Sequence, residues 1–150
     1  GINKSRIDNL NKIFKDLINQ NINSKNEYLS ELDLFSKWIG DDMIKILSLC
    51  TNLKKLTRLD LSYNAISCKG MKYFRNCRFL INLNIFHLYN NSISDKGMEY
   101  FSKCEFLKNL TDLSLANNSI SEKGMEYFSK CEFLKNLTSI DLSNNSIGDK

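Results

Sequence analysis

The 150-residue sequence has no long apolar run, no clustered basic stripe, no proline and only one histidine. Its apolar runs are a few residues long, whereas a membrane-spanning helix needs about 20. The net charge of +4 is dispersed, whereas a nucleic-acid-binding surface shows a clustered basic patch. No Cys/His group has metal-ligand spacing, and the glycines do not form a phosphate-binding loop. We therefore predict no membrane association, no nucleic-acid partner, no metal and no cofactor.

Four of the five cysteines recur at one spacing. Cys50, Cys77, Cys104 and Cys131 are separated by 27 residues, so we expect them at the same place in successive structural units. Packed helices lie about 10 Å apart, which exceeds the Cα separation of about 7 Å that a disulfide tolerates. We therefore predict buried, reduced thiols and a cytoplasmic protein.

The same period organises most of the chain. Residues 91–110 (NSISDKGMEYFSKCEFLKNL) recur as residues 118–137 with a single difference, Asp95 against Glu122. A fixed period of this length is typical of a solenoid. We divide residues 29–150 into a degenerate unit 29–55, three full units 56–82, 83–109 and 110–136, and a partial unit 137–150.

Within each full unit the hydrophobic period changes. Leu59 and Leu61 alternate with polar residues, which is typical of a short strand. Met71, Phe74 and Cys77 then fall on one face of a helix. No unit can bury its apolar face alone, so we expect the strands to stack in parallel and the helices to pack beside one another. Because strands need about 4.8 Å and helices about 10 Å, the array should curve with its strands inside.

Residues 56–66 read LxxLxLxxNxI, and close variants of this frame begin at positions 83, 110 and 137. The frame resembles the leucine-rich repeat, and the 27-residue period is similar to the ribonuclease-inhibitor-like subclass. The resemblance implies an α/β fold, a curved solenoid with parallel strands on the concave face and helices on the convex face. It also implies an inward-pointing asparagine ladder that satisfies buried backbone groups: Asn64, Asn91, Asn118 and Asn145. Lys37 stands where the first asparagine is due, which leaves the geometry of the first turn open.

The two ends of the chain depart from the repeat. Residues 1–28 place Ile7, Leu10, Phe14, Leu17 and Ile18 on one helical face, with the helix ending near Gln20. We interpret residues 1–28 as an N-terminal helical cap and loop over the first repeat; a separate partner-binding helix is the alternative. The last unit has a strand but no helix. Either the chain is part of a longer array, or a partner such as a second copy covers this edge.

The residues between the leucines face outward from the predicted sheet. The N-terminal half is the richer, because it combines aromatic bulk with polar tips, as binding hot spots do. Phe35, Ser62 and Tyr89 share one row of this face. We predict a partner-binding patch on the concave face, with an ordinary solvated face as the alternative: Phe35, Asp60, Tyr63, Ile85, His87 and Tyr89.

Catalysis has little support in the sequence. Cys68 is expected in the turn toward the convex side and His87 on the sheet, too far apart for a Cys–His pair. Asp33 and Asp60, as neighbours on an open sheet, are better suited to attract a basic partner. We therefore predict a non-catalytic module that binds a protein partner. The alternatives are the recognition arm of a larger enzyme, such as a ubiquitin-ligase effector, and a homodimer assembled through the C-terminal edge. The near-identical repeats also resemble those of bacterial effectors delivered into a host cytosol.

Overall fold

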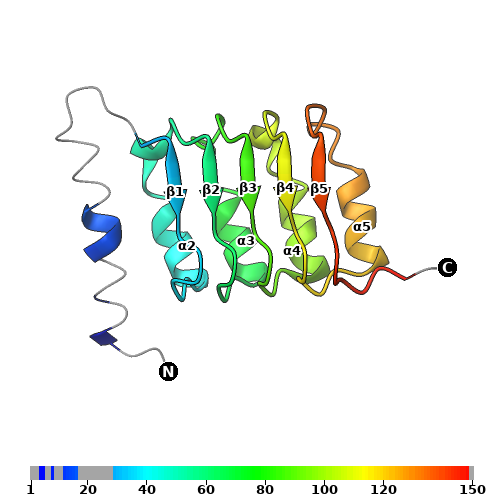
Figure 1. Cartoon of the computed structure of the whole chain (residues 1–150), viewed down its shortest axis with the longest axis horizontal. Coiled ribbons are helices and arrows are strands. Elements are labelled where there is room, and N and C mark those ends of the chain that lie inside the picture. Colours follow the sequence, from blue (N-terminus) through cyan, green and yellow to red (C-terminus); the bar gives the residue numbers. More distant parts are fainter. Residues whose placement is uncertain (1–3, 6–7, 9–11, 17–28, 149–150) are drawn as a thin grey trace.

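The computed structural model describes residues 4–5, 8, 12–16 and 29–148. From residue 29 onward, strands and helices alternate in two layers, with the strands side by side in front of the helices (Figure 1). This arrangement confirms the predicted α/β solenoid. The strands are β1 (Glu31–Asp33), β2 (Arg58–Asp60), β3 (Ile85–His87), β4 (Asp112–Ser114) and β5 (Ser139–Asp141). The helices are α2 (Asp41–Leu47), α3 (Cys68–Phe74), α4 (Ser94–Phe101) and α5 (Glu122–Ser129), with two short 3-10 helices at Thr51–Leu53 and Glu105–Leu107.

The sheet is parallel and follows the chain in the order β1-β2-β3-β4-β5. Leu32 pairs with Leu59, and Leu59 pairs with Phe86, so every step of the register is 27 residues. The pairing continues past the strand ends, where Leu34 N donates to Asp60 O at 2.8 Å and Ser36 N to Ser62 O at 3.0 Å. The period of the sequence is therefore also the period of the backbone hydrogen bonds.

The core lies between the sheet and the helices. In the second unit Leu59 and Leu61 of the strand region meet Met71 and Phe74 of α3, and all four are buried. The helix can approach this closely because a Cβ at Gly70 would lie 2.6 Å from Asp41 Oδ1 and 2.7 Å from Ile66 Cγ2. We predicted a helix that included Cys77, but α3 ends at Phe74, and the chain has turned back toward the sheet by the time it buries this thiol.

The five cysteines are all free, and four of them are buried in the core. Burial raises the pKa of Cys104 to about 12 and that of Cys131 to about 11. Cys104 Sγ also donates to Tyr100 O at 3.6 Å. These thiols are held protonated at neutral pH, so they act as small core residues and not as nucleophiles.

An asparagine in each turn joins one repeat to the repeat before it. Asn118 Nδ2 donates to Leu115 O of its own repeat at 3.2 Å and to Leu88 O of the preceding repeat at 2.8 Å. Its Oδ1 accepts from Ile93 N at 3.3 Å. Asn118 is fully buried, so its amide satisfies backbone groups that water cannot reach. The other members bond in the same way: Asn64, Asn91 and Asn145.

The direction of this ladder explains why Lys37 is tolerated. Each asparagine bonds backward, to the repeat that precedes it. Asn64 therefore serves the first turn, accepting from Lys37 N at 3.1 Å and from Ile39 N at 2.8 Å. Lys37 itself is exposed. The first repeat can lack its own asparagine because the second repeat supplies the amide.

The described part of the N-terminal segment is helical over residues 12–16. Phe14 is only 3% exposed and belongs to the core cluster, and Ile13 packs against that cluster. Ile7, Leu10, Leu17, Ile18, Gln20 and the following loop lie outside the described residues. The capping role of residues 1–28 stays a prediction. None of the helices in the described part of the chain is long and apolar enough to cross a bilayer.

Candidate protein-binding site

Three aromatic rings gather at the ends of the first three strands, on the open face of the sheet that the helices do not cover. We call Phe35, Tyr63 and Tyr89 the ring cluster. Its centroids are 5.1 Å apart for Phe35 and Tyr63, 5.2 Å for Tyr63 and Tyr89, and 6.0 Å for Phe35 and Tyr89. Phe35 is 38% exposed and Tyr63 is 49% exposed. The cluster is therefore a self-packed apolar surface that solvent can reach.

Ser62 lies beneath the ring cluster, which is a correction to the exposed row that we predicted for it. Phe35, Ser62 and Tyr89 hold equivalent positions in three successive repeats, so Phe35 and Tyr89 are two strand spacings apart, about 9.6 Å. Their centroids are nevertheless 6.0 Å apart, so the two rings lean toward each other. Ser62 is fully buried and its hydroxyl has no hydrogen-bond partner among the described residues. A larger side chain at this position would keep the rings apart.

Tyr63 occupies a backbone conformation that suits asparagine better. Its φ is +56°, in the left-handed region. The equivalent positions of the next three repeats have φ of +54°, +53° and +54°, and all three are asparagine: Asn90, Asn117 and Asn144. Asparagine tolerates this region far better than a bulky residue, for which it costs roughly 1–2 kcal/mol. Tyr63 therefore adds an exposed ring to the face at the expense of local backbone energy.

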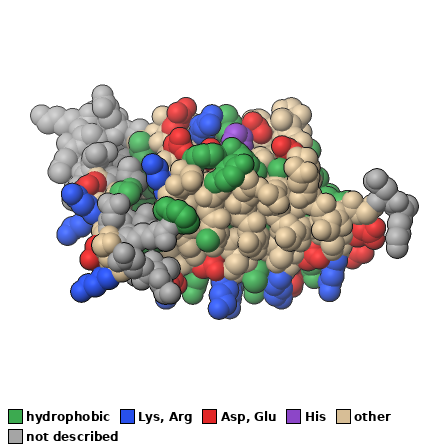
Figure 2. All heavy atoms as spheres, turned by 60° about the horizontal axis from the view of Figure 1, so that its bottom comes forward, with side chains coloured by type: hydrophobic (Ala, Val, Ile, Leu, Met, Phe, Trp, Pro, Cys, Tyr) green, Lys and Arg blue, Asp and Glu red, His purple; other side chains and the backbone are tan. Residues whose placement is uncertain are grey.

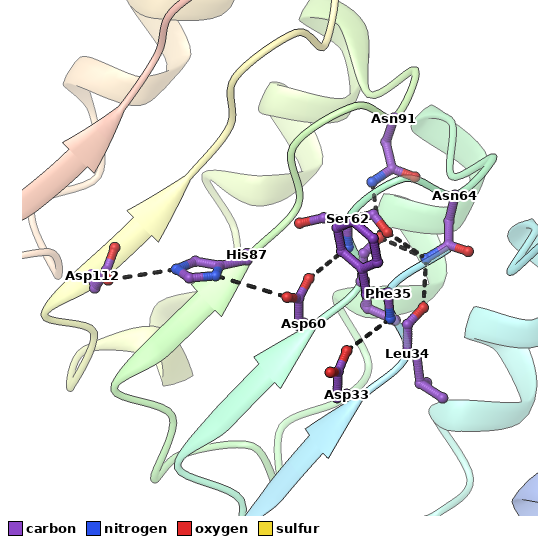
Figure 3. A network of polar contacts seen from close by, with 10 residues as sticks. Asp33, Leu34, Phe35, Asp60, Ser62, Asn64, His87, Asn91 and Asp112 are labelled. Atoms are coloured by element: carbon purple, nitrogen blue, oxygen red, sulfur yellow. Dashed lines mark hydrogen bonds and ion pairs between the residues drawn. The ribbon is translucent and has the colours of Figure 1, made fainter. Parts of the chain in front are cut away.

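A row of polar side chains lies next to the ring cluster and crosses β2, β3 and β4. His87 stands between two carboxylates, with Nδ1 4.0 Å from Asp60 Oδ2 and Nε2 3.5 Å from Asp112 Oδ2 (Figure 3). Asp60 is 7% exposed, and its other oxygen accepts from Ser62 N at 2.9 Å. Asp112 was absent from our predicted patch. It holds the position in β4 that Ile85, a patch residue, holds in β3, and this equivalence could have indicated it.

The ring cluster and the carboxylates influence each other. Burial first, then the charges of Asp60, Tyr63 and Asp33, raise the pKa of Tyr89. Figure 2 shows hydrophobic side chains gathered beside the histidine, with acidic side chains nearby. A shallow hollow continues from His87 and Tyr89 toward β4 and β5. The rings and the polar row thus form one continuous surface.

Five of the six predicted patch residues contribute to this surface. Phe35, Tyr63 and Tyr89 form the ring cluster, and Asp60 and His87 belong to the polar row. Ile85 is half-buried in β3, two residues before His87, and is not one of the rings or of the polar row. Its neighbours in register are Arg58 and Asp112.

The described residues offer no arrangement suited to covalent chemistry. His87 ends β3 in the sheet layer, whereas Cys68 begins α3 in the helix layer. Asp33 and Asp60 are neighbours in register, but each uses one oxygen to accept a backbone N–H two residues further on. No group of three or more metal-ligating side chains is found in this part of the chain.

Comparison with known proteins agrees with the repeat frame. A leucine-rich-repeat family model matches residues 52–74, 106–129 and 133–150. A search of curated proteins finds no match.

Among solved structures, an internalin from Listeria monocytogenes is 33% identical with a TM-score of 0.52, and the match covers 69% of this chain and 26% of the internalin. The chain thus spans about a quarter of that relative. The leucine-rich-repeat ectodomain of a receptor kinase from Arabidopsis thaliana is 20% identical with a TM-score of 0.32, and the match covers 65% of this chain and 62% of the ectodomain. The repeat frame, the fold and the family match show that this chain is a leucine-rich-repeat protein.

Proposed function

We propose that this chain is a non-catalytic protein-interaction module that binds a protein partner on the concave, open face of its sheet. Leucine-rich-repeat domains in general serve protein interaction and typically do not catalyse reactions. The proposed contact surface is the ring cluster together with the polar row of Asp60, His87 and Asp112. Aromatic side chains next to polar groups are the composition that dominates binding energy in protein interfaces.

The observation that supports this proposal most strongly is the placement of Tyr63. An exposed aromatic ring at φ +56° does not stabilise the turn, because the chain itself uses asparagine at the same place in three other repeats. Residues kept in an unfavourable backbone conformation cluster at functional sites. The simplest reason for tyrosine here is contact with a partner.

The test replaces Tyr63 and Tyr89 by the residues found at the equivalent positions of the fourth repeat. Tyr63→Asn introduces the residue at Asn117, and Tyr89→Ala introduces the residue at Ala116. We expect Tyr63→Asn alone to change the free energy of unfolding by less than about 1 kcal/mol, because relief of the left-handed strain is offset by loss of the ring contacts with Phe35 and Tyr89. We expect the double variant to lose partner binding, measured by affinity capture and then by titration of the captured protein.

The matched control changes two tyrosines on the convex helices, Tyr73→Ala/Tyr127→Ala. Both are half-buried and lie under lysine side chains, with Lys45 Nζ 5.7 Å from the Tyr73 centroid and Lys130 Nζ 5.6 Å from the Tyr127 centroid. This variant should be less stable but should still bind. If Tyr63→Asn/Tyr89→Ala retains every partner at unchanged affinity, the proposed face is wrong.

Homotypic assembly is a second candidate, supported by the exposure of β5. All three residues of β5 are exposed, and Ile140 is 41% exposed. Exposed strands of this kind invite pairing with another chain. Light scattering at high concentration tests this idea: a dimer that Ile140→Lys dissociates would support it, and a monomer at all concentrations would refute it.

Finer classification is also proposed. The 27-residue register supports the ribonuclease-inhibitor-like subclass, and the free buried thiols are consistent with a reducing, cytoplasmic location or delivery into a host cytosol. Burial of Phe14 in the core cluster supports the N-terminal segment as a cap.

A further inference from the structure

The open sheet face has the opposite charge to the chain as a whole. The five strands hold five carboxylates against one arginine and one histidine, whereas the net charge of the chain is +4. The described ion pairs include no lysine or arginine bound to these carboxylates. Complementary potentials orient partners and exclude wrong ones. A partner segment seated here should therefore be basic.

The carboxylates nearest the ring cluster are held in place. Asp33 Oδ1 accepts from Phe35 N at 3.0 Å, and Asp60 Oδ1 accepts from Ser62 N at 2.9 Å. These bonds fix each carboxylate and leave its second oxygen directed elsewhere, toward His87 in the case of Asp60. The two residues are adjacent in register, so their charges act together. Preorganised acceptors of this kind favour charge-assisted hydrogen bonds.

The ring cluster discriminates between kinds of cation. Its centroids lie 5.1–6.0 Å apart, so the rings touch and cannot enclose an ammonium group between them. A cation must therefore lie on an exposed outer face of Phe35 or Tyr63. A planar guanidinium stacks on such a face and can also donate two parallel hydrogen bonds to one carboxylate. An ammonium group stacks less well and does not present this pair of donors.

Ser62 adds an unused hydrogen-bonding group beneath the rings. Its hydroxyl is fully buried and has no partner among the described residues, under the position where Phe35 and Tyr89 converge. A buried polar group without a partner destabilises the fold. A donor reaches this oxygen only if Phe35 and Tyr89 separate, so a guanidinium on the outer face of the rings does not bond it while the rings stay in contact.

We infer that the concave face recognises an arginine of its partner, whose guanidinium stacks on the ring cluster and donates to the carboxylates of Asp33 and Asp60. This inference rests on the proposed function, because it names the chemistry of the partner at the same face. It implies that arginine, and not basic charge alone, decides binding. Arginine-containing segments should bind more tightly than segments with the neutral isostere citrulline.

The experiment selects binders from a random dodecapeptide display library on the full chain. Recovered peptides are then tested on Tyr63→Asn/Tyr89→Ala and on Asp33→Asn/Asp60→Asn. Asparagine keeps the Oδ1 acceptor for the backbone N–H groups, but it removes the charge and replaces the second oxygen by an NH2 donor. The control Asp42→Asn/Glu126→Gln removes the same charge from exposed convex positions.

We expect peptides that depend on Tyr63 and Tyr89 to be enriched in arginine. Replacing that arginine by citrulline should weaken binding to the wild type about tenfold. The same replacement should change binding to Asp33→Asn/Asp60→Asn less than twofold, and binding to the control variant about tenfold. Each of these results supports the inference.

Two outcomes would overturn the arginine site, and only the second would also overturn the proposed function. Peptides that need Tyr63 and Tyr89 but show no arginine enrichment, or tolerate citrulline, refute the arginine site and leave the proposed function intact. A selection that yields no peptide dependent on Tyr63 and Tyr89 refutes the proposed function and the inference with it.

Discussion

The asparagine ladder contains a redundancy that makes two of its members cooperate. Leu88 O accepts from Asn91 Nδ2 at 3.0 Å and from Asn118 Nδ2 at 2.8 Å, and no other donor to it is found among the described residues. Either asparagine alone keeps this buried carbonyl partnered. We therefore predict that removing both costs more than the sum of the two single changes.

The loss of unfolding free energy depends on which buried backbone groups are left without any hydrogen-bond partner. Asn118→Ala leaves Ile93 N without an acceptor, whereas Leu115 O keeps Asn145 and Ala116 O keeps Asn90 N. Asn91→Ala likewise leaves only Ile66 N. A buried group without a partner costs about 1–3 kcal/mol, so each single variant should lose about 2 kcal/mol.

The double variant adds a third unpartnered group, Leu88 O. The coupling between the two changes should therefore be about 1–3 kcal/mol beyond additivity. The assay is urea unfolding followed by circular dichroism, with trimethylamine N-oxide present so that the double variant remains folded.

Asn64 provides the matched control pair with Asn118. Asn64 bonds Leu34 O, Leu61 O and Ser62 O, none of which Asn118 contacts. The two lie two repeats apart, and their changes should add within about 0.5 kcal/mol. Equal coupling in both pairs, or none in Asn91/Asn118, would show that the shared carbonyl does not explain the ladder's cooperativity.

The remaining predictions concern a second ladder, in which an aspartate of one repeat caps the helix of the next. Asp95 accepts from Ser121 Oγ at 2.5 Å and Ser121 N at 2.7 Å, whereas Cys68, at the equivalent position, gives Ser94 no such acceptor, and Ser94 takes φ +64°. Cys68→Asp should therefore stabilise the fold by about 1 kcal/mol in urea unfolding; an unchanged midpoint would contradict this. Burial opposes ionisation of Asp95, but hydrogen bonds from Ser121 and Gly124 outweigh it and lower its pKa below 3.8. Because the folded-state pKa is lowered, this stabilisation is complete above the unfolded value and is lost as pH falls through the folded one. The stability difference between wild type and Asp95→Asn should thus shrink below pH 3.8; a constant difference from pH 6 to pH 2.5 would refute it.

The repeat frame was sufficient to predict the fold, because the physical requirement is local and recurs. Residues 56–66 place three leucines inward and an asparagine in the turn, and the same spacing recurs in the next three units. Pairing of Leu59 with Phe86 then follows from stacking equivalent positions. Boundaries were less accurate, as the end of α3 before Cys77 shows.

The sequence predicted which residues face outward from the sheet, but not how their side chains contact one another. Burial of Ser62 depends on the side-chain torsions of Phe35 and Tyr89, which no hydrophobic pattern encodes. The approach of His87 to Asp112 is a contact between diagonal positions on adjacent strands, and reading the rows one at a time misses it. The aspartate ladder was missed for a similar reason, because Asp95 and Ser121 belong to different units.

Both ladders run between repeats, and this limits where the chain can vary. An asparagine in one turn must fit the backbone of the turn before it, so turn and helix sequences are constrained in neighbouring units together. The outward strand positions take no part in either ladder, which is why residues 84–90 (NIFHLYN) and 111–117 (TDLSLAN) differ while the segments after them are nearly identical. Tyr63 lies where the variable strand positions meet the constrained turn, at a position where three other repeats have asparagine. In the free chain, the contacts of the Tyr63 ring with Phe35 and Tyr89 offset only part of the backbone strain, since about half of the ring is exposed. We propose that a partner covering the exposed half of the ring supplies the remaining stabilisation.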